Sequence, residues 1–108
     1  MTRIPLLTSF LLVSIFVLTP SLAHADVTLP KIFSTNMVLQ RDLPLPIWGT
    51  ADSGEEVIVK FAGQSKPTQA GADGKWMIRL DPLATSNREQ TLLVEAKNKI
   101  EFSGVLVG

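Results

Sequence analysis

The chain has 108 residues, which is enough for one domain, and its ten basic side chains balance its ten acidic ones. Because a neutral chain offers no basic stripe to phosphate groups, the sequence predicts no nucleic-acid partner. It contains no cysteine, which excludes disulfides, thiol catalysis and lipid attachment to cysteine.

The beginning of the chain has the pattern of a secretory signal peptide. Arg3 supplies a positive charge, an apolar run extends from residue 6 to residue 18, and Ala23-His24-Ala25 has the small-residue form of a cleavage site. A helix that spans a membrane needs about 20 mostly apolar residues, and this run is shorter. The pattern therefore predicts export rather than anchoring.

The predicted domain boundaries follow from the cleavage site. Residues 1–25 are assigned to the signal peptide and residues 26–108 to one mature domain, with cleavage between Ala25 and Asp26. The mature protein is then expected to be secreted or periplasmic. We expect it to have no membrane contact after cleavage, because it carries no polybasic or amphipathic segment.

Short apolar runs separated by turn residues fill the mature segment. After an extended arm over 27–33, strands are predicted over 37–39, from Ile47 onward, and over 56–61, 64–70, 75–80, 90–96, 99–102 and 105–108. Residues 43–46 are predicted to be an edge or connector, because Pro44 and Pro46 cannot donate a ladder hydrogen bond. Seven to eight short strands predict an all-β fold, an antiparallel β-sandwich that is Ig-like or jelly-roll-like.

The strongest local signal is the turn at Asp73-Gly74. Asp-Gly favours a two-residue type I′ turn, which would pair the strand over 64–70 with the strand that follows the turn. This register places Trp76 opposite Gly71, and the alternation puts Trp76, Ile78 and Leu80 on one inward face. Further along, residues 84–89 are predicted to be a solvated loop, and Ser103-Gly104 is predicted to separate the last two strands.

The mature segment offers no reactive constellation. The only histidine of the chain, His24, lies in the predicted signal peptide. Residues 26–108 therefore cannot form a Ser-His-Asp site, a Cys-His site or a zinc site built on histidine or thiolate. Glu55 and Glu56 are adjacent on a strand and point to opposite faces, so they are interpreted as a solvated strand start rather than a catalytic pair. We predict no catalytic residue, no metal ligand and no cofactor.

The two tryptophans are the remaining candidates for binding. Trp48 and Trp76 could present a platform on which a sugar ring stacks, as in carbohydrate-binding modules. Each is flanked by aliphatic residues that are predicted to point inward, which favours core positions for both.

A series of short segments resembles the N-terminal region of sialate O-acetylesterases, which are secreted carbohydrate esterases of the SGNH-hydrolase type. The segments occur in order and at compatible spacing over nearly the whole mature chain. They are Phe33-Ser34, Asn36 to Arg41, Pro46 to Gly49, Gly54-Glu55, Phe61 to Gln64, Ala72 to Trp76 and Val105 to Gly108.

The resemblance implies a β-sandwich that precedes an α/β catalytic domain. In the family, a serine on a Gly-Gln-Ser-Asn-Met-type segment attacks an acetyl ester on a sugar. That segment would lie beyond Gly108, so no catalytic residue is carried over and this chain alone is predicted to be inactive. The implied partners are a downstream SGNH-type catalytic domain and an acetylated glycan. The alternative is a free-standing secreted β-sandwich that binds glycan or protein.

Overall fold

The computed structural model describes residues 26–108, so the predicted signal peptide and the Ala25 side of the cleavage site lie outside the described residues. The described part is all-β. Its strands are β1 (Val38–Leu39), β2 (Leu45–Thr50), β3 (Glu56–Phe61), β4 (Gln64–Gln69), β5 (Lys75–Leu80), β6 (Ser86–Glu95) and β7 (Lys99–Val107). Within this part of the chain, no helix is long and apolar enough to cross a membrane.

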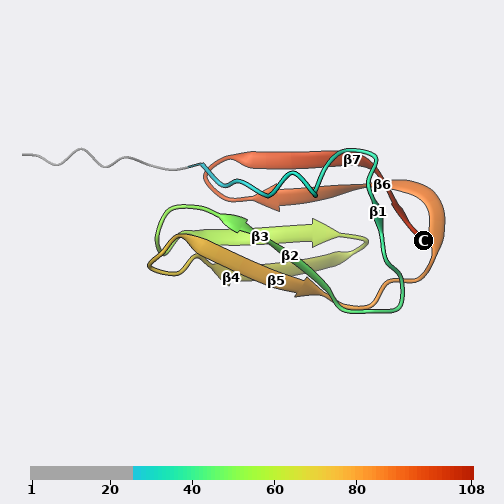
Figure 1. The fold of residues 1–108 in the computed structure, drawn as a ribbon, viewed down its shortest axis with the longest axis horizontal. Helices are drawn as coiled ribbons and strands as arrows, with labels where there is room; N and C mark the ends of the chain where they lie inside the picture. The colour runs from blue at the N-terminus through green and yellow to red at the C-terminus, as the bar shows by residue number, and fades with distance from the viewer. Residues whose placement is uncertain (1–25) are drawn as a thin grey trace, which may run out of the picture.

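Two sheets face each other, which confirms the predicted sandwich (Figure 1). The larger sheet has the order β1-β7-β6-β3-β4, and the smaller sheet pairs β2 with β5. Neighbouring strands are antiparallel except β1 and β7, which are parallel. Since β3, β6 and β7 share one sheet while β2 and β5 form the other, the order matches the Ig-like form of the prediction.

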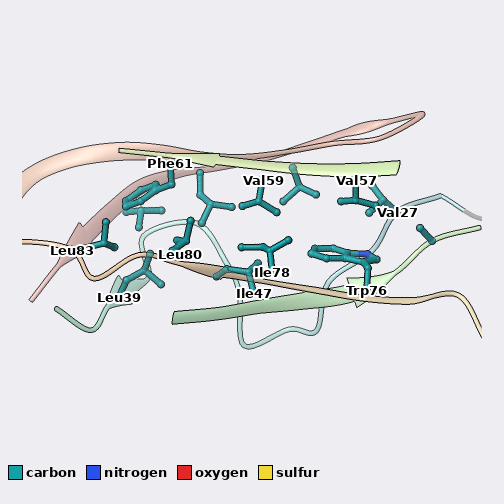
Figure 2. Packing of buried hydrophobic residues seen from close by; sticks show 14 of the residues in the cluster. Val27, Leu39, Ile47, Val57, Val59, Phe61, Trp76, Ile78, Leu80 and Leu83 are labelled. Atoms are coloured by element: carbon teal, nitrogen blue, oxygen red, sulfur yellow. The ribbon is translucent and has the colours of Figure 1, made fainter. Parts of the chain in front are cut away.

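The core lies between the sheets and follows the period-two alternation of the strands (Figure 2). In β3 and β5, every second side chain is buried and the residues between them are exposed or half-buried, which confirms the inward face predicted for β5. The largest fully buried side chains are Ile47, Leu80, Leu92, Val27, Val57, Val59, Val94 and Val105. Burial of an aliphatic side chain of this kind contributes roughly 1.5–3 kcal/mol, so the interior accounts for most of the stabilisation.

The predicted hairpin at Asp73-Gly74 is wrong in its strand pairing. The chain turns here, with the Gly74 N–H donating to the Gly71 carbonyl at 2.9 Å, but only Gly74 of this pair has positive φ, at 79°. β4 pairs with β3 and β5 pairs with β2, so the turn carries the chain from one sheet to the other. The crossing is favoured because it sets the apolar face of β5 against the larger sheet.

The two-residue hairpin turn occurs one connection earlier, at Ala62-Gly63. Phe61 pairs directly with Gln64, and both turn residues have positive φ, 51° for Ala62 and 81° for Gly63. These are the features of a type I′ turn. β4 follows as the edge strand of the larger sheet, and Pro67 is tolerated there because one side of the strand has no ladder partner.

Three strand boundaries also differ from the prediction. β2 begins at Leu45 rather than Ile47 and includes Pro46; both strands of a two-stranded sheet are edges, so residues 45 and 46 have the edge position predicted for them. β6 begins at Ser86 rather than after the predicted loop, because β7 continues far enough for Val107 to pair with Ser86. The last two predicted strands are one strand, β7.

Gly104 explains how β7 remains continuous. Between the pairs Leu92–Phe102 and Gln90–Val105, β7 carries one residue more than β6, which is a β-bulge. Gly104 has φ of 66°, a value that glycine adopts readily. The extra residue changes which residues of β7 face inward. Before the bulge, the even-numbered residues Ile100 and Phe102 pack on the core, and after it the odd-numbered residues Val105 and Val107 are buried.

Candidate functional site

Glu55 is a structural residue and not a solvated one, which corrects the interpretation of the Glu55-Glu56 pair. Its side chain is buried, whereas Glu56 is exposed on the opposite face of the chain. The Asp52 N–H donates to Glu55 Oε1 at 3.2 Å and the Lys97 N–H donates to Oε2 at 2.8 Å. The carboxylate therefore accepts hydrogen bonds from two backbone N–H groups and connects the turn at Asp52 to the turn at Lys97.

The described residues hold no grouping that resembles a metal site. Among residues 26–108, no three His, Cys, Asp or Glu side chains gather closely enough to hold an ion. The pKa of the Glu95 carboxyl lies below its ordinary value because Lys60 donates a hydrogen bond to it and adds its positive charge. The 2.7 Å Lys60–Glu95 pair links β3 to β6. This ion pair lies on the surface of the larger sheet, and its role is to connect two strands.

Trp76 lies in the core, as predicted, but it packs against a different glycine. It is 3% exposed and sits with Val27 and Val57 between the sheets (Figure 2). The pairing of β2 with β5 sets Gly49 opposite it, and a Cβ on Gly49 would lie 2.9 Å from Trp76 Cζ2. Within the described part of the chain, Trp76 Nε1 finds no hydrogen-bond partner.

Trp48 does not lie in the core, which corrects the second tryptophan prediction. It alternates with the buried residues Ile47 and Gly49 and so points to the outer face of the smaller sheet, where it is 37% exposed. Phe33 packs edge-on against it, with ring centroids 4.9 Å apart and an interplanar angle of 78°. The contact holds the indole ring in place on the surface.

The outer face of the β2–β5 sheet has an apolar half and a polar half. In the apolar half, Trp48 pairs across the strands with Met77, which is 50% exposed. In the polar half, Thr50 pairs with Lys75, and the Thr50 and Thr28 hydroxyls are hydrogen-bonded at 2.6 Å. A groove of about 810 Å³ runs along this face and is lined by Thr28, Leu29, Pro30, Trp48, Gly49, Thr50, Gln69, Gly71, Lys75, Trp76 and Met77.

A second exposed region carries several large apolar side chains. Ile32, Val38 and Leu43 are among the most exposed large hydrophobic residues in the described chain. Ile32 and Val38 line a smaller groove of about 220 Å³ together with Trp48. Leu43 and Val38 lie beside Gly108 in an adjoining depression, whose lining also includes the polar residues Gln40, Arg41 and Asp42. Large apolar side chains that are exposed near one another are typical of contacts with protein.

Comparison with known proteins relates the fold to an enzyme class. No protein-family model and no curated protein matches the chain. Among solved structures, the chain is similar to a carbohydrate acetylesterase from Xanthomonas citri, at 34% sequence identity over 76% of this chain and with a TM-score of 0.73. The chain is thus related to a carbohydrate esterase. Its match covers 19% of the acetylesterase chain, so it spans about a fifth of that protein.

This relation agrees with the coarse part of the resemblance seen in the sequence, that of a carbohydrate esterase. No residue of the described segment was predicted to carry catalysis, and the groove contains no histidine or cysteine. The surface position of Trp48 was missed because its aliphatic neighbours suggested burial. The alternation of Ile47, Trp48 and Gly49 along one strand could have predicted this exposure. Successive side chains of a strand point to opposite faces, so a buried Ile47 requires Trp48 to point outward.

Proposed function

We propose that residues 26–108 form the accessory β-sandwich of a secreted, SGNH-type carbohydrate acetylesterase in which another domain performs the hydrolysis. The observation that carries the proposal is the similarity to one fifth of a carbohydrate acetylesterase, at an identity high enough to imply more than a shared fold. The sialate class of acetyl ester, suggested by the sequence resemblance, is the substrate that we assign to the parent enzyme.

The chemistry of the chain is consistent with a non-catalytic role. Acyl transfer by a serine or cysteine needs an activated nucleophile, and residues 26–108 contain neither histidine nor cysteine. The reacting serine is therefore assigned to the SGNH-type domain. The sandwich contributes stability and position to that domain.

The apolar surface around Val38 and Leu43 is the contact that we assign to the catalytic domain. Large hydrophobic side chains that are exposed close together mark surfaces that a partner covers. Interfaces between domains of one chain bury surface of this kind. The proposal also includes export by the predicted signal peptide, followed by cleavage before Asp26.

A domain exchange tests the proposal. The matching segment of the Xanthomonas acetylesterase is replaced by residues 26–108, and the chimera is compared with the parent enzyme and with a form that lacks the segment, using an acetylated sugar as substrate. We expect the chimera to keep substantial esterase activity, the deletion to lose soluble active protein, and the present chain alone to hydrolyse nothing.

Matched variants locate the contact. Leu43→Asp in the chimera should reduce soluble activity, because it places a charge in the proposed domain interface. Ser65→Asp, on the exposed face of β4, serves as the control and should have no effect. A chimera as inactive as the deletion, or hydrolysis by the present chain that survives further purification, contradicts the accessory role.

A further inference from the structure

We propose that the outer face of the β2–β5 sheet binds a saccharide, with a sugar ring stacked on Trp48. The proposal goes beyond the accessory role, and it holds whether or not the chain assists an esterase. It assigns the ligand to the 810 Å³ groove described above and not to the apolar surface around Val38.

The apolar half of the face suits one side of a pyranose ring. The C–H groups of such a ring form an apolar surface, and an indole face is broad enough to cover it. Trp48 is 37% exposed and is held edge-on by Phe33 at 4.9 Å, so its orientation is set before a ligand arrives. Met77, directly across the strands, extends the apolar surface to the neighbouring strand.

The polar half supplies partners for sugar hydroxyls. Thr50, Thr28 and Gln69 are exposed and line the groove, and they offer hydroxyl and amide groups that both donate and accept hydrogen bonds. Lys75 adds three donors beside Thr50, and within residues 26–108 its ammonium makes no hydrogen bond or ion pair. An apolar platform next to convergent polar groups is the composition of a small-molecule site.

The neighbouring groove provides a comparison within the same molecule. It has about 220 Å³ and is lined by Ile32, Phe33, Val38 and other apolar residues, with Gln40 as its polar member. Such a lining offers a polyhydroxylated ligand almost no hydrogen bonds. The larger groove combines both kinds of group and has a volume within the roughly 300–1,000 Å³ range of ligand sites. The saccharide is therefore assigned to the larger groove.

Calorimetric titration of the exported full chain tests the assignment. The probes are a neutral glycan (cellohexaose), an anionic glycan (an oligogalacturonate) and an oligosialic acid, each in native and chemically acetylated form. We expect at least one probe to bind with a Kd of about 1 mM or tighter, in the range of weak specific ligands, and to change the fluorescence of Trp48. Absence of binding by all six probes at concentrations of about 10 mM overturns the proposal.

Variants connect the binding to the stacking surface. Trp48→Ala should weaken binding by about tenfold, whereas Trp48→Phe keeps an aromatic face and should retain most of it. Lys75→Met should give a smaller loss through the polar half. Leu43→Ala removes an exposed apolar side chain outside the groove and should bind like the wild type. Thermal melting of each variant verifies that it is folded.

Two results overturn the stacking model. One is equal binding by Trp48→Ala and the wild type. The other is loss of saccharide binding when the domain is placed in the esterase chimera, together with burial of Trp48, since a protein partner would then occupy the face. Failure of the domain exchange itself leaves the titration unaffected, so the two proposals fail separately.

Discussion

At the scale of single residues, Trp76 and Trp48 show how one residue type serves two purposes in neighbouring strands. Trp76 fills the core beside Gly49, while Trp48 lies on the opposite face of the smaller sheet. Trp76→Ala should lower the free energy of unfolding by about 3–5 kcal/mol, because it leaves a large cavity. Chemical denaturation measures this loss, and Trp48→Ala, on the exposed face, should cost clearly less. Equal losses for the two variants would contradict the assignment of Trp76 to the core.

Ala62 carries backbone strain that can be relieved. It occupies the first position of the type I′ turn with φ of 51°, where asparagine and glycine are preferred. Ala62→Asn should raise the free energy of unfolding by about 0.5–1 kcal/mol, because the left-handed conformation costs asparagine less. Ala62→Ser, which lacks this preference, is the control and should change little. The gain is measured by thermal or urea unfolding, and an Asn variant no more stable than the Ser variant would contradict the strain.

At the scale of elements, the bulge in β7 depends on a glycine whose Cβ position is occupied by the Asn36 amide. A Cβ on Gly104 would collide with Asn36 Oδ1, and the Asn36 N–H is held by the Ser103 carbonyl at 2.8 Å. Gly54 has a similar φ of 77°, but open space surrounds its Cβ position. A side chain at Gly54 would therefore introduce backbone strain alone, whereas a side chain at Gly104 would introduce both strain and a collision.

This comparison gives a prediction for the sheet. Gly104→Ala should destabilise the protein by about 1–3 kcal/mol and broaden the amide signals of β6 and β7, since it combines strain with collision. Gly54→Ala should cost about 1 kcal/mol from strain alone. Denaturation curves and amide spectra provide the measurement. If Gly54→Ala were the more costly change, the collision with Asn36 would have no role.

At the scale of the whole molecule, the N-terminal arm begins to pack immediately after the predicted cleavage site. Val27 is buried, and its N–H donates to Asn98 Oδ1 at 2.8 Å. Asp26, just before it, is exposed. We predict that the exported protein starts at Asp26, because the Ala23-His24-Ala25 pattern places the cut there. Intact-mass spectrometry of the exported chain checks this, and a protein that retains Arg3 would contradict it.

Much of the local structure could be predicted because it depends on residues that are close in the sequence. The alternation in β5 determines which of its side chains point together, so the inward face of Trp76, Ile78 and Leu80 is predicted correctly. The break between the predicted strands over 90–96 and 99–102 likewise locates the connection at Lys97-Asn98. Composition alone shows that residues 26–108 contain no histidine and no cysteine, which excludes Ser-His-Asp and Cys-His catalytic sites from this segment.

Strand pairing, the burial of Glu55 and the binding face were decided only by the tertiary structure. The turn at Asp73-Gly74 has the same local signal whether it joins paired strands or crosses between sheets, and the choice depends on contacts such as Ile47 with Ile78. The same pairing places Trp48 beside Met77 and Thr50 beside Lys75, so the candidate site exists only after β2 and β5 meet. Local periodicity specifies the direction of each side chain along its own strand, but partners from distant segments are selected by the burial of the common core.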